Sequence, residues 1–378
     1  MKKTAIWATI LATGCCVPAY AQPPINGVSA VEPPPPGYDP EASSAAVNAR
    51  FALPPEPDPT KAPRTHDAWR HAVRAARNRD AAIIERTTVF HGPAMRKSQV
   101  ATNGEVSVST AAARAVGAAE RNAAANPPAI EANSTSASDM LNWSGTSVVN
   151  GTTANLEAVT ALFVVPTAHQ AFGQCADGWE YASFWPGIDG NGGSGSGDVL
   201  QAGVNVNAFC AGNNVTQNQY YPWIEWYPLS ETRVDSPAIN PGDLVFIEVW
   251  SVSPTQGYAH FYNHSTGISA QYSITAPAGT VVHGSSVEWV VERPTLGSNL
   301  ANLTNYIAAP WVEGVAWNYA DPNPTTYSMG GSPDVGTLEQ ITMLDNSNNP
   351  ISAATIESES FLWFETSGSA CGVNPNFC

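Results

Sequence analysis

The sequence predicts an all-β domain in its C-terminal two thirds, preceded by a segment that is partly helical. From Asn142 onward, runs rich in β-branched and aromatic residues alternate with clusters of Gly, Pro, Asn and Asp, which is typical of strands joined by turns. This part has about 237 residues, which lies within the range of single-domain sandwiches and barrels. The clearest strand candidates are 159–165, 243–252, 257–262, 286–291 and 360–365.

Charge divides the chain at the same place. Fourteen of the 16 Lys and Arg residues precede Asn142, whereas 20 of the 32 Asp and Glu residues lie from Asn142 onward. The formal charge is therefore +2 before this position and −18 after it. A domain this acidic would repel nucleic acid, so we expect no nucleic-acid partner.

The first 21 residues have the features of a secretory signal. Two lysines precede an apolar stretch that ends near Gly14, and Ala19-Tyr-Ala21 before Gln22 is a small-x-small cleavage site. Ala12-Thr-Gly-Cys15 allows an alternative interpretation as a lipoprotein site, although alanine replaces the usual large aliphatic residue. No later apolar run reaches 18 residues, so we expect a secreted or periplasmic protein without membrane contact after signal removal.

The cysteines fit an oxidising compartment. Removal of residues 1–21 leaves an even number, namely Cys175, Cys210, Cys371 and Cys378. Three pairings are possible, and we favour Cys175–Cys210 with a local Cys371–Cys378 loop.

Residues 22–135 differ in composition from the rest of the chain. The proline-rich part, 22–60, is expected to be extended or disordered. The Ala- and Arg-rich part that follows has the composition of helices at 68–74 and 111–120, and a polar stretch at 133–139 indicates a linker. A basic segment ahead of an acidic domain suggests an intramolecular pro-segment held by charge at neutral pH and loosened by acid. An ordinary spacer or interaction arm is the alternative, and composition alone leaves both open.

Four strand segments in the acidic part direct polar and aromatic side chains to one face: 185–190, 200–203, 223–228 and 288–292. Because side chains alternate along a strand, Trp185 and Asp189 share a face, as do Trp223, Glu225 and Tyr227. The apolar residues of the same segments turn the other way, toward a core: Ile188, Leu200, Ile224 and Val291. The pattern predicts a binding or catalytic groove.

Several other kinds of site are excluded. The glycine-rich loop 190–197 is followed by neither a lysine nor a helix signal, so it is not a phosphate loop. His260 and His264 would stand about 13 Å apart on a strand, and we predict no metal and no other cofactor. Glu288 and Glu292 are separated by the same distance, which is too long for a glycosidase pair, although Glu225 with Glu292 across strands keeps a glycosidase possible.

Taken together and in order, these segments resemble the glutamic peptidases, or eqolisins, the family of scytalidoglutamic and aspergilloglutamic peptidase. The resemblance covers roughly 150 residues and rests on six motifs: Asn142-Trp-Ser-Gly145, Trp185-Pro-Gly-Ile-Asp-Gly190, Leu200-Gln-Ala-Gly203, Trp223-Ile-Glu-Trp-Tyr-Pro228, Asn240-Pro-Gly-Asp243 and Glu288-Trp-Val-Val-Glu292. It implies an antiparallel β-sandwich of two large curved sheets, concanavalin-like, over 136–378, with 22–135 as its pro-segment.

The resemblance also implies an activity and a set of site residues. Gln201 and Glu292 match the catalytic positions of an acid endopeptidase made as a precursor, with Glu292 as general base toward water and Gln201 as oxyanion donor. The positions that match groove-lining or supporting residues are Trp143, Trp185, Asp189, Trp223, Glu225, Tyr227 and Glu288. The expected partners are protein or peptide substrates and the chain's own pro-segment, and we expect a monomer.

Three positions depart from the family pattern. Pro186 removes a backbone donor, so its strand is expected at an edge or bulged. Arg293 follows Glu292 where an acidic residue is usual; alternation turns it to the other face, and we expect its charge to lower the pKa of that glutamate from there. Tyr221 replaces an acidic residue four positions before Glu225. A carbohydrate-binding or glycoside-hydrolysing sandwich that stacks sugars on the tryptophans is the alternative function.

Overall fold

The computed structural model describes twelve stretches of the chain, and all structural statements below concern them. These are residues 23–32, 34–35, 37–61, 63–75, 82–96, 135–149, 156–170, 178–191, 197–212, 214–318, 326–331 and 337–366. The proposed signal, the expected helix at 111–120 and three of the four cysteines lie outside them. Cys210 is buried on a strand, and the disulfide pairing stays a prediction.

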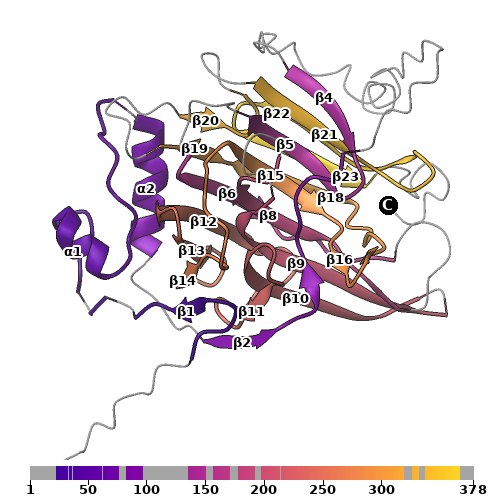
Figure 1. The fold of residues 1–378 in the computed structure, drawn as a ribbon, viewed down its shortest axis with the longest axis horizontal. Helices are drawn as coiled ribbons and strands as arrows, with labels where there is room; N and C mark the ends of the chain where they lie inside the picture. Colours follow the sequence, from indigo (N-terminus) through magenta and orange to yellow (C-terminus); the bar gives the residue numbers. More distant parts are fainter. Residues whose placement is uncertain are drawn as a thin grey trace, which may run out of the picture.

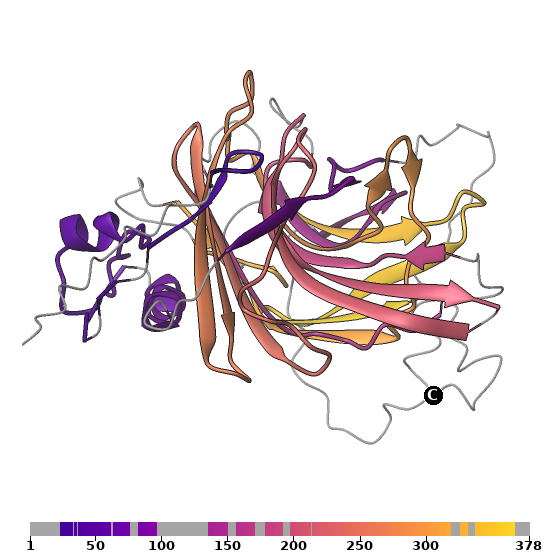
Figure 2. The ribbon, with the colours of Figure 1, turned by 90° about the horizontal axis from the view of Figure 1, so that it is seen from below.

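Two curved layers of mainly antiparallel strands face each other, which confirms the predicted sandwich (Figures 1 and 2). The first layer runs, strand beside strand, through β2 (Ile83–Arg86), β11 (Thr232–Val234), β10 (Asn214–Trp226), β9 (Leu200–Ala211), β8 (Ser183–Ile188), β15 (Ser286–Glu292), β5 (Trp143–Val149), β21 (Thr337–Leu344) and β4 (Thr135–Met140). The short strand β7 (Gly178–Glu180) precedes β8 along the same edge of β9.

The second layer contains the strands that were predicted at 159–165, 243–252, 257–262 and 360–365. Its order is β1 (Val28–Ala30), β14 (Ile268–Thr275), β13 (Gln256–Asn263), β12 (Leu244–Ser253), β6 (Ala158–Val164), β18 (Ala308–Glu313), β23 (Phe361–Thr366) and β22 (Pro350–Ser358). Two short strands, β19 (Val315–Trp317) and β20 (Tyr327–Ser328), extend it beside β6. Hydrogen bonding continues from one layer to the other through β21, whose first half pairs with β5 and whose last residues pair with β22.

Period-two alternation places the core between the layers. Ile188, Leu200, Ile224 and Val291 from the first layer belong to one buried cluster with Val249 and other residues of the second layer. The side chains between them in sequence point to the opposite, concave face of the first layer, where Trp143, Trp185 and Trp223 form a second buried cluster. The alternation predicted from the sequence is therefore confirmed.

Strand β8 corrects the expectation about Pro186. The strand is central, between β15 and β9, and its register with β9 is the same before and after the proline. Pairing with β9 is simply skipped at Trp185 and Pro186, while pairing with β15 is continuous. A single missing donor is tolerated here because the other edge of the strand keeps its ladder.

The N-terminal residues are more ordered than their proline content predicts. Within 23–61, β1 adds to the edge of β14 and α1 (Ala45–Arg50) forms one short helix. The predicted helix around 68–74 is present as α2 (Pro63–Ala75), and its Trp69 is buried and donates from Nε1 to the carbonyl of Pro54. Figure 2 shows α2 on the outer side of the strands β12 to β14.

Two further parts of the N-terminal region pair with the sandwich. The strand β2 extends the first layer beyond β11, and β3 (Val89–Phe90) forms a small separate sheet with β16 (Thr295–Leu296) and β17 (Asn299–Leu300). The predicted linker at 133–139 is wrong over most of its length, because β4 pairs in parallel with β21. An unpaired sheet edge supplies backbone partners that local composition does not reveal.

Candidate active site

Three cross-strand rows of side chains line the concave face of the first layer. Register places Glu288, Gly187, Gln201 and Glu225 in one row. The next row contains Val290, Trp185, Gly203 and Trp223, and the third contains Trp143, Glu292, Ser183, Asn205 and Tyr221. Gln201 and Glu292 therefore stand in different rows, on strands separated by β8.

Glycine at position 203 makes room for the aromatic row. A Cβ atom there would lie 2.7 Å from Cζ2 of Trp223 and 2.7 Å from Cβ of Trp185, which is closer than packed atoms tolerate. The Leu-Gln-Ala-Gly segment thus presents Gln201 to the groove and lets the Trp223 indole lie flat beside it.

The carboxylate of Glu292 is fully buried and accepts hydrogen bonds from a residue of β8 and from the residue that precedes β5. Trp185 Nε1 donates to its Oε2 over 3.0 Å, and Asn142 Nδ2 donates to its Oε1 over 3.4 Å. Trp143 packs edge-on against Trp185, with ring centroids 5.0 Å apart. Burial raises the pKa of Glu292, and the hydrogen bonds that favour its ionised form offset this only in part.

The groove is filled by residues 87–96 of the chain itself. Backbone hydrogen bonds join Thr87 and Val89 to Glu231 at one end, over 3.2 and 3.0 Å. At the other end, Ala94 N donates to the carbonyl of Gly190 over 3.0 Å, and Met95 N donates to Asn142 Oδ1 over 2.8 Å. The segment passes across the face that carries Gln201 and Glu292.

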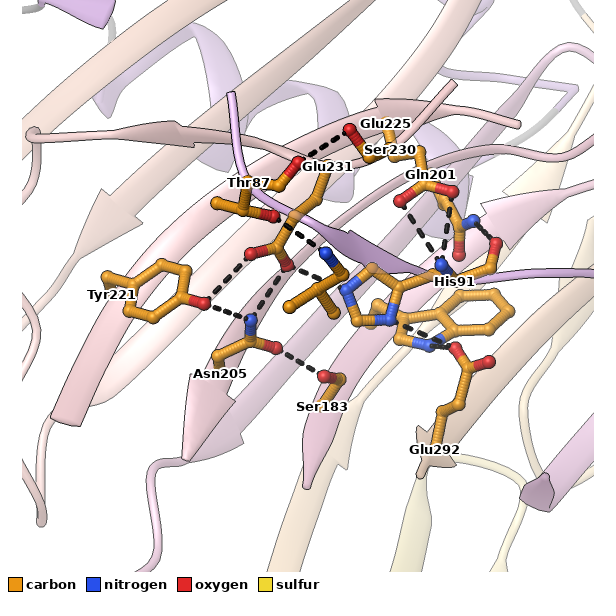
Figure 3. Close-up of polar contacts among 12 residues, drawn as sticks. Thr87, His91, Ser183, Gln201, Asn205, Tyr221, Glu225, Ser230, Glu231 and Glu292 are labelled. Carbon is orange, nitrogen blue, oxygen red and sulfur yellow. Dashed lines mark hydrogen bonds and ion pairs between the residues drawn. The ribbon is translucent and has the colours of Figure 1, made fainter. Parts of the chain in front are cut away.

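His91 lies at the centre of this segment and contacts both predicted catalytic residues (Figure 3). Its Nδ1 is 3.2 Å from Oε2 of Glu292, and its carbonyl oxygen accepts a hydrogen bond from Nε2 of Gln201. Its backbone N–H points to the carboxylate of Glu225, at 3.1 and 3.2 Å from the two oxygens. The imidazole stacks on Trp223, with centroids 3.7 Å apart and ring planes 13° apart.

A further carboxylate, Glu231, receives the other ring nitrogen of His91. The distance from His91 Nε2 to Glu231 Oε2 is 2.8 Å, and both side chains are fully buried. Tyr221 Oη donates to Glu231 Oε1 over 2.8 Å, and Asn205 Nδ2 donates to Oε2 over 2.7 Å. Ser183 in turn donates to Asn205 Oδ1, so the position of Glu231 is defined by neighbours other than His91.

The charges of this cluster shift the acidity of its members. Burial alone would lower the pKa of His91, but the hydrogen bonds to Glu231 and Glu292 outweigh it and raise the pKa to about 10. Burial raises the pKa of Glu225 well above its usual range, and His91 counteracts this in part. A carboxylate lies at each ring nitrogen and the pKa of His91 is raised to about 10, so at neutral pH both nitrogens are protonated and the ring is an imidazolium.

The other predicted supporting residues divide into two groups. Tyr227 lies against the segment in the groove, since a Cβ atom on Gly92 would be 3.4 Å from its ring. Glu288 is buried on the groove face, and Ser147 Oγ donates to it over 3.4 Å. Asp189 instead holds the loop 283–285, accepting hydrogen bonds from three backbone N–H groups and from Ser285 Oγ.

Arg293 does not act as the sequence suggested. Its guanidinium donates to the carbonyls of Leu141 and Leu344, over 2.7 and 3.3 Å, and burial lowers its pKa. The pKa of Glu292 is raised rather than lowered. The physical reason is that alternation turns Arg293 away from the groove face.

Three residues of the cluster were not predicted from the sequence: His91, Glu231 and Asn205. A histidine followed by Gly-Pro is the only local signal at His91, and Glu231 follows the Tyr227-Pro228 turn without a distinctive motif. The contacts of His91 with Glu231 and Glu292 join residues more than 100 positions apart, and Asn205 takes part through its hydrogen bond to Glu231.

Comparison with known proteins gives a family match and several similar structures. The model of the Peptidase A4 family matches residues 141–359, more than half of the chain. A structure of scytalido-glutamic peptidase with a transition state analog inhibitor is 18% identical, covers 60% of this chain and 98% of its own, and has a TM-score of 0.47. Aspergilloglutamic peptidase from Aspergillus niger is 21% identical, covers 50% and 99%, and has a TM-score of 0.40. No curated protein sequence matches this chain.

Proposed function

Because the chain belongs to the Peptidase A4 family, whose members are glutamic endopeptidases, we propose that it is a secreted acid endopeptidase that uses Gln201 and Glu292 as its catalytic pair. The same proposal includes synthesis as a precursor whose residues 22–135 keep the groove closed until the protein meets acid.

In this mechanism Glu292 is the general base and acid. Its ionised carboxylate takes a proton from a water molecule, and the water oxygen forms a bond to the scissile carbonyl carbon. The carbonyl oxygen becomes an oxyanion that accepts a hydrogen bond from Gln201 Nε2. Glu292 then gives its proton to the leaving nitrogen as the C–N bond breaks, so no covalent enzyme intermediate forms.

The observation that carries the proposal is the position of His91 between the two residues. Gln201 Nε2 donates to a main-chain carbonyl, which is the group that becomes an oxyanion in peptide hydrolysis. The same residue brings its side chain to Oε2 of Glu292. A peptide backbone in the groove can thus meet the amide donor while the carboxylate stays within reach.

The contacts of residues 87–96 support the precursor part of the proposal. His91 takes the space beside Glu292 that an attacking water would need, and the imidazole donates to the lone pair that would accept the proton. A base engaged in this way cannot activate water. At the end of the segment, Arg96 binds Glu339 over 2.6 Å and adds an ionic contact between the segment and the sandwich.

Secretion and a monomeric state belong to the proposal as well. The signal-like residues 1–21 support secretion. Among the residues that the structure describes, none forms a helix long and apolar enough to span a bilayer.

The test is acidification of the purified full-length precursor. Wild type is expected to lose its N-terminal region and to digest a denatured protein substrate, whereas Glu292→Gln and Gln201→Ala lose about 10²–10⁴-fold in rate. Glu288→Gln makes the same chemical change on the same strand and face, so it is the matched comparison and is expected to lose far less. Wild-type rates in Glu292→Gln, or a larger loss in Glu288→Gln, would contradict the assignment.

A further inference from the structure

We propose that the space enclosed by Trp223, Glu231 and Glu292 is a binding site for an imidazolium group, and that it takes free imidazole or the side chain of a histidine-bearing peptide when His91 is absent. The inference builds on the proposed function, because it gives a chemical class of ligand to the same groove.

The geometry of the site matches the three properties of an imidazolium. The ring is flat, and Trp223 stacks on it at 3.7 Å and 13°. It has a donor at each end, and carboxylate oxygens of Glu292 and Glu231 meet these donors at 3.2 and 2.8 Å. It carries one positive charge, and the buried carboxylates of Glu231 and Glu292 meet it, while the buried Glu225 accepts the backbone N–H of His91.

Other side chains satisfy only some of these contacts. Phenylalanine would stack on Trp223 but would supply neither the N–H donors nor the positive charge that the buried carboxylates of Glu231 and Glu292 receive from the imidazolium, which is costly. A lysine ammonium lacks the flat face for stacking, although it carries the charge. A glutamine carries no charge. The site therefore discriminates by shape, charge and the two donor directions together.

The site does not depend on His91 for its shape. Tyr221 Oη and Asn205 Nδ2 hold Glu231, while Trp185 Nε1 and Asn142 Nδ2 hold Glu292. Arg233 lies 4.6 Å from the centre of the Tyr221 ring and supports that side chain from behind. Because each carboxylate keeps its own donors, removal of the imidazole leaves a prearranged cavity.

One consequence concerns peptides in the groove. A histidine bound at this position engages Glu292 and displaces the water that hydrolysis requires. Peptides that place histidine there should bind and resist cleavage, so an imidazole-bearing peptide is an inhibitor of this groove.

The direct test uses the full chain with Gln201→Ala, which prevents self-digestion, and compares it with the double variant Gln201→Ala/His91→Ala. Addition of about 10 mM imidazole at pH 6 is expected to raise the melting midpoint of the double variant by about 2–4 °C, as a ligand with a dissociation constant of about 1 mM would. The single variant, whose site holds its own histidine, should shift by less than about 1 °C. Binding is read without activity, so failure of this test is separate from failure of the catalytic proposal.

A comparison of imidazole with one matched ligand sharpens the result. 1-Methylimidazole keeps the ring and the charge but loses one N–H donor, and it should shift the double variant clearly less than imidazole. Equal shifts with both ligands, equal shifts in the single and double variants, or no shift in a folded double variant would each overturn the proposal.

A second measurement needs no substitution at His91. Nitrogen chemical shifts of His91 in the Gln201→Ala full chain should show both ring nitrogens protonated at pH 8, because Glu231 and Glu292 lie at the two nitrogens, with Tyr221 behind Glu231 and Glu225 at the backbone N–H of His91. A neutral His91 ring at pH 8 would contradict the imidazolium assignment, even if the double variant failed to fold.

Discussion

Nδ1 of His91 lies 3.2 Å from Oε2 of Glu292, although the two residues are 201 positions apart in the sequence. The contact joins a part of the chain that precedes the family domain to the residue that matches the catalytic glutamate. It links the proposed catalytic groove to the proposed closure of the precursor.

Replacement of His91 should release the precursor. In the full chain, His91→Ala removes two hydrogen bonds to carboxylates, each of which contributes about 1.5–3 kcal/mol when charged. We expect acid-dependent loss of the N-terminal region to become at least about 10-fold faster. The measurement is the time course of N-terminal loss by mass spectrometry. His66→Ala in α2 is the control, since its ring lies near Glu56 on the outside, and an unchanged rate in His91→Ala would argue against the block.

The ion pair between Arg96 and Glu339 should make closure of the groove sensitive to acid. Burial opposes ionisation of Glu339, but hydrogen bonds from Arg96 and Asn191 outweigh it and lower the pKa of this carboxyl below its usual 4.5. A lowered carboxyl pKa stabilises the closed form above pH 4.5, and this contribution is lost as the pH falls through the lowered value. Glu339→Gln should therefore release the segment at a higher pH than wild type. A pH series of N-terminal loss tests this, and an unchanged midpoint would contradict it.

The whole protein should lose stability as the pH rises from 5 to 8. Burial raises the pKa of Glu225, Glu248 and Glu288 well above 4.5, and neither carboxylate oxygen of Glu248 has a hydrogen-bond partner among the described residues. A raised carboxyl pKa contributes stability below the unfolded value, and the contribution is lost as the pH rises through the folded value. Melting temperatures across this range should fall, and Glu248→Gln should reduce the fall. The exposed Glu32→Gln is the control, and a maximum of stability near pH 8 would refute the expectation.

Asp189 should matter for stability through the loop 283–285. Its φ of 68° lies in the left-handed region, which asparagine tolerates better than alanine does. Asp189→Asn keeps the backbone conformation but weakens the hydrogen bonds that the carboxylate accepts, at a cost of about 1–3 kcal/mol. Asp189→Ala should lower the free energy of unfolding by more than Asp189→Asn does. Thermal melts measure both, and a wild-type melting temperature in Asp189→Asn would show that the charge does not hold the loop.

Much of the sandwich could be predicted because strand patterns are local. Apolar residues alternate with polar or aromatic ones along the strands, and this predicted that Ile188, Leu200, Ile224 and Val291 face the core. The structure agrees. The order of the N-terminal region could not be predicted in this way. Proline-rich composition indicates an extended chain, but β1 is ordered by the free edge of β14 and β2 by the free edge of β11.

The proposed catalytic residues and the side chains around them differ in the same way in how far local sequence predicts them. Gln201 and Glu292 stand in short motifs that can be recognised by their order along the sequence. Glu231 and Asn205 gain meaning only where β9, β10 and the turn before β11 bring them to the end of the His91 ring. Asp189 shows the reverse case, because it lies in a recognisable motif but its carboxylate is used by a loop about 95 residues away.

The sequence by itself determined the all-β class, the face that each strand presents to the groove and the family to which residues 141–359 belong. These properties follow from short-range alternation and from motifs that keep their spacing. Only the tertiary structure decided which residue stands between Gln201 and Glu292. His91 reaches them because backbone pairing of β2 and β3 carries its segment across the sheet, and no local pattern encodes that pairing.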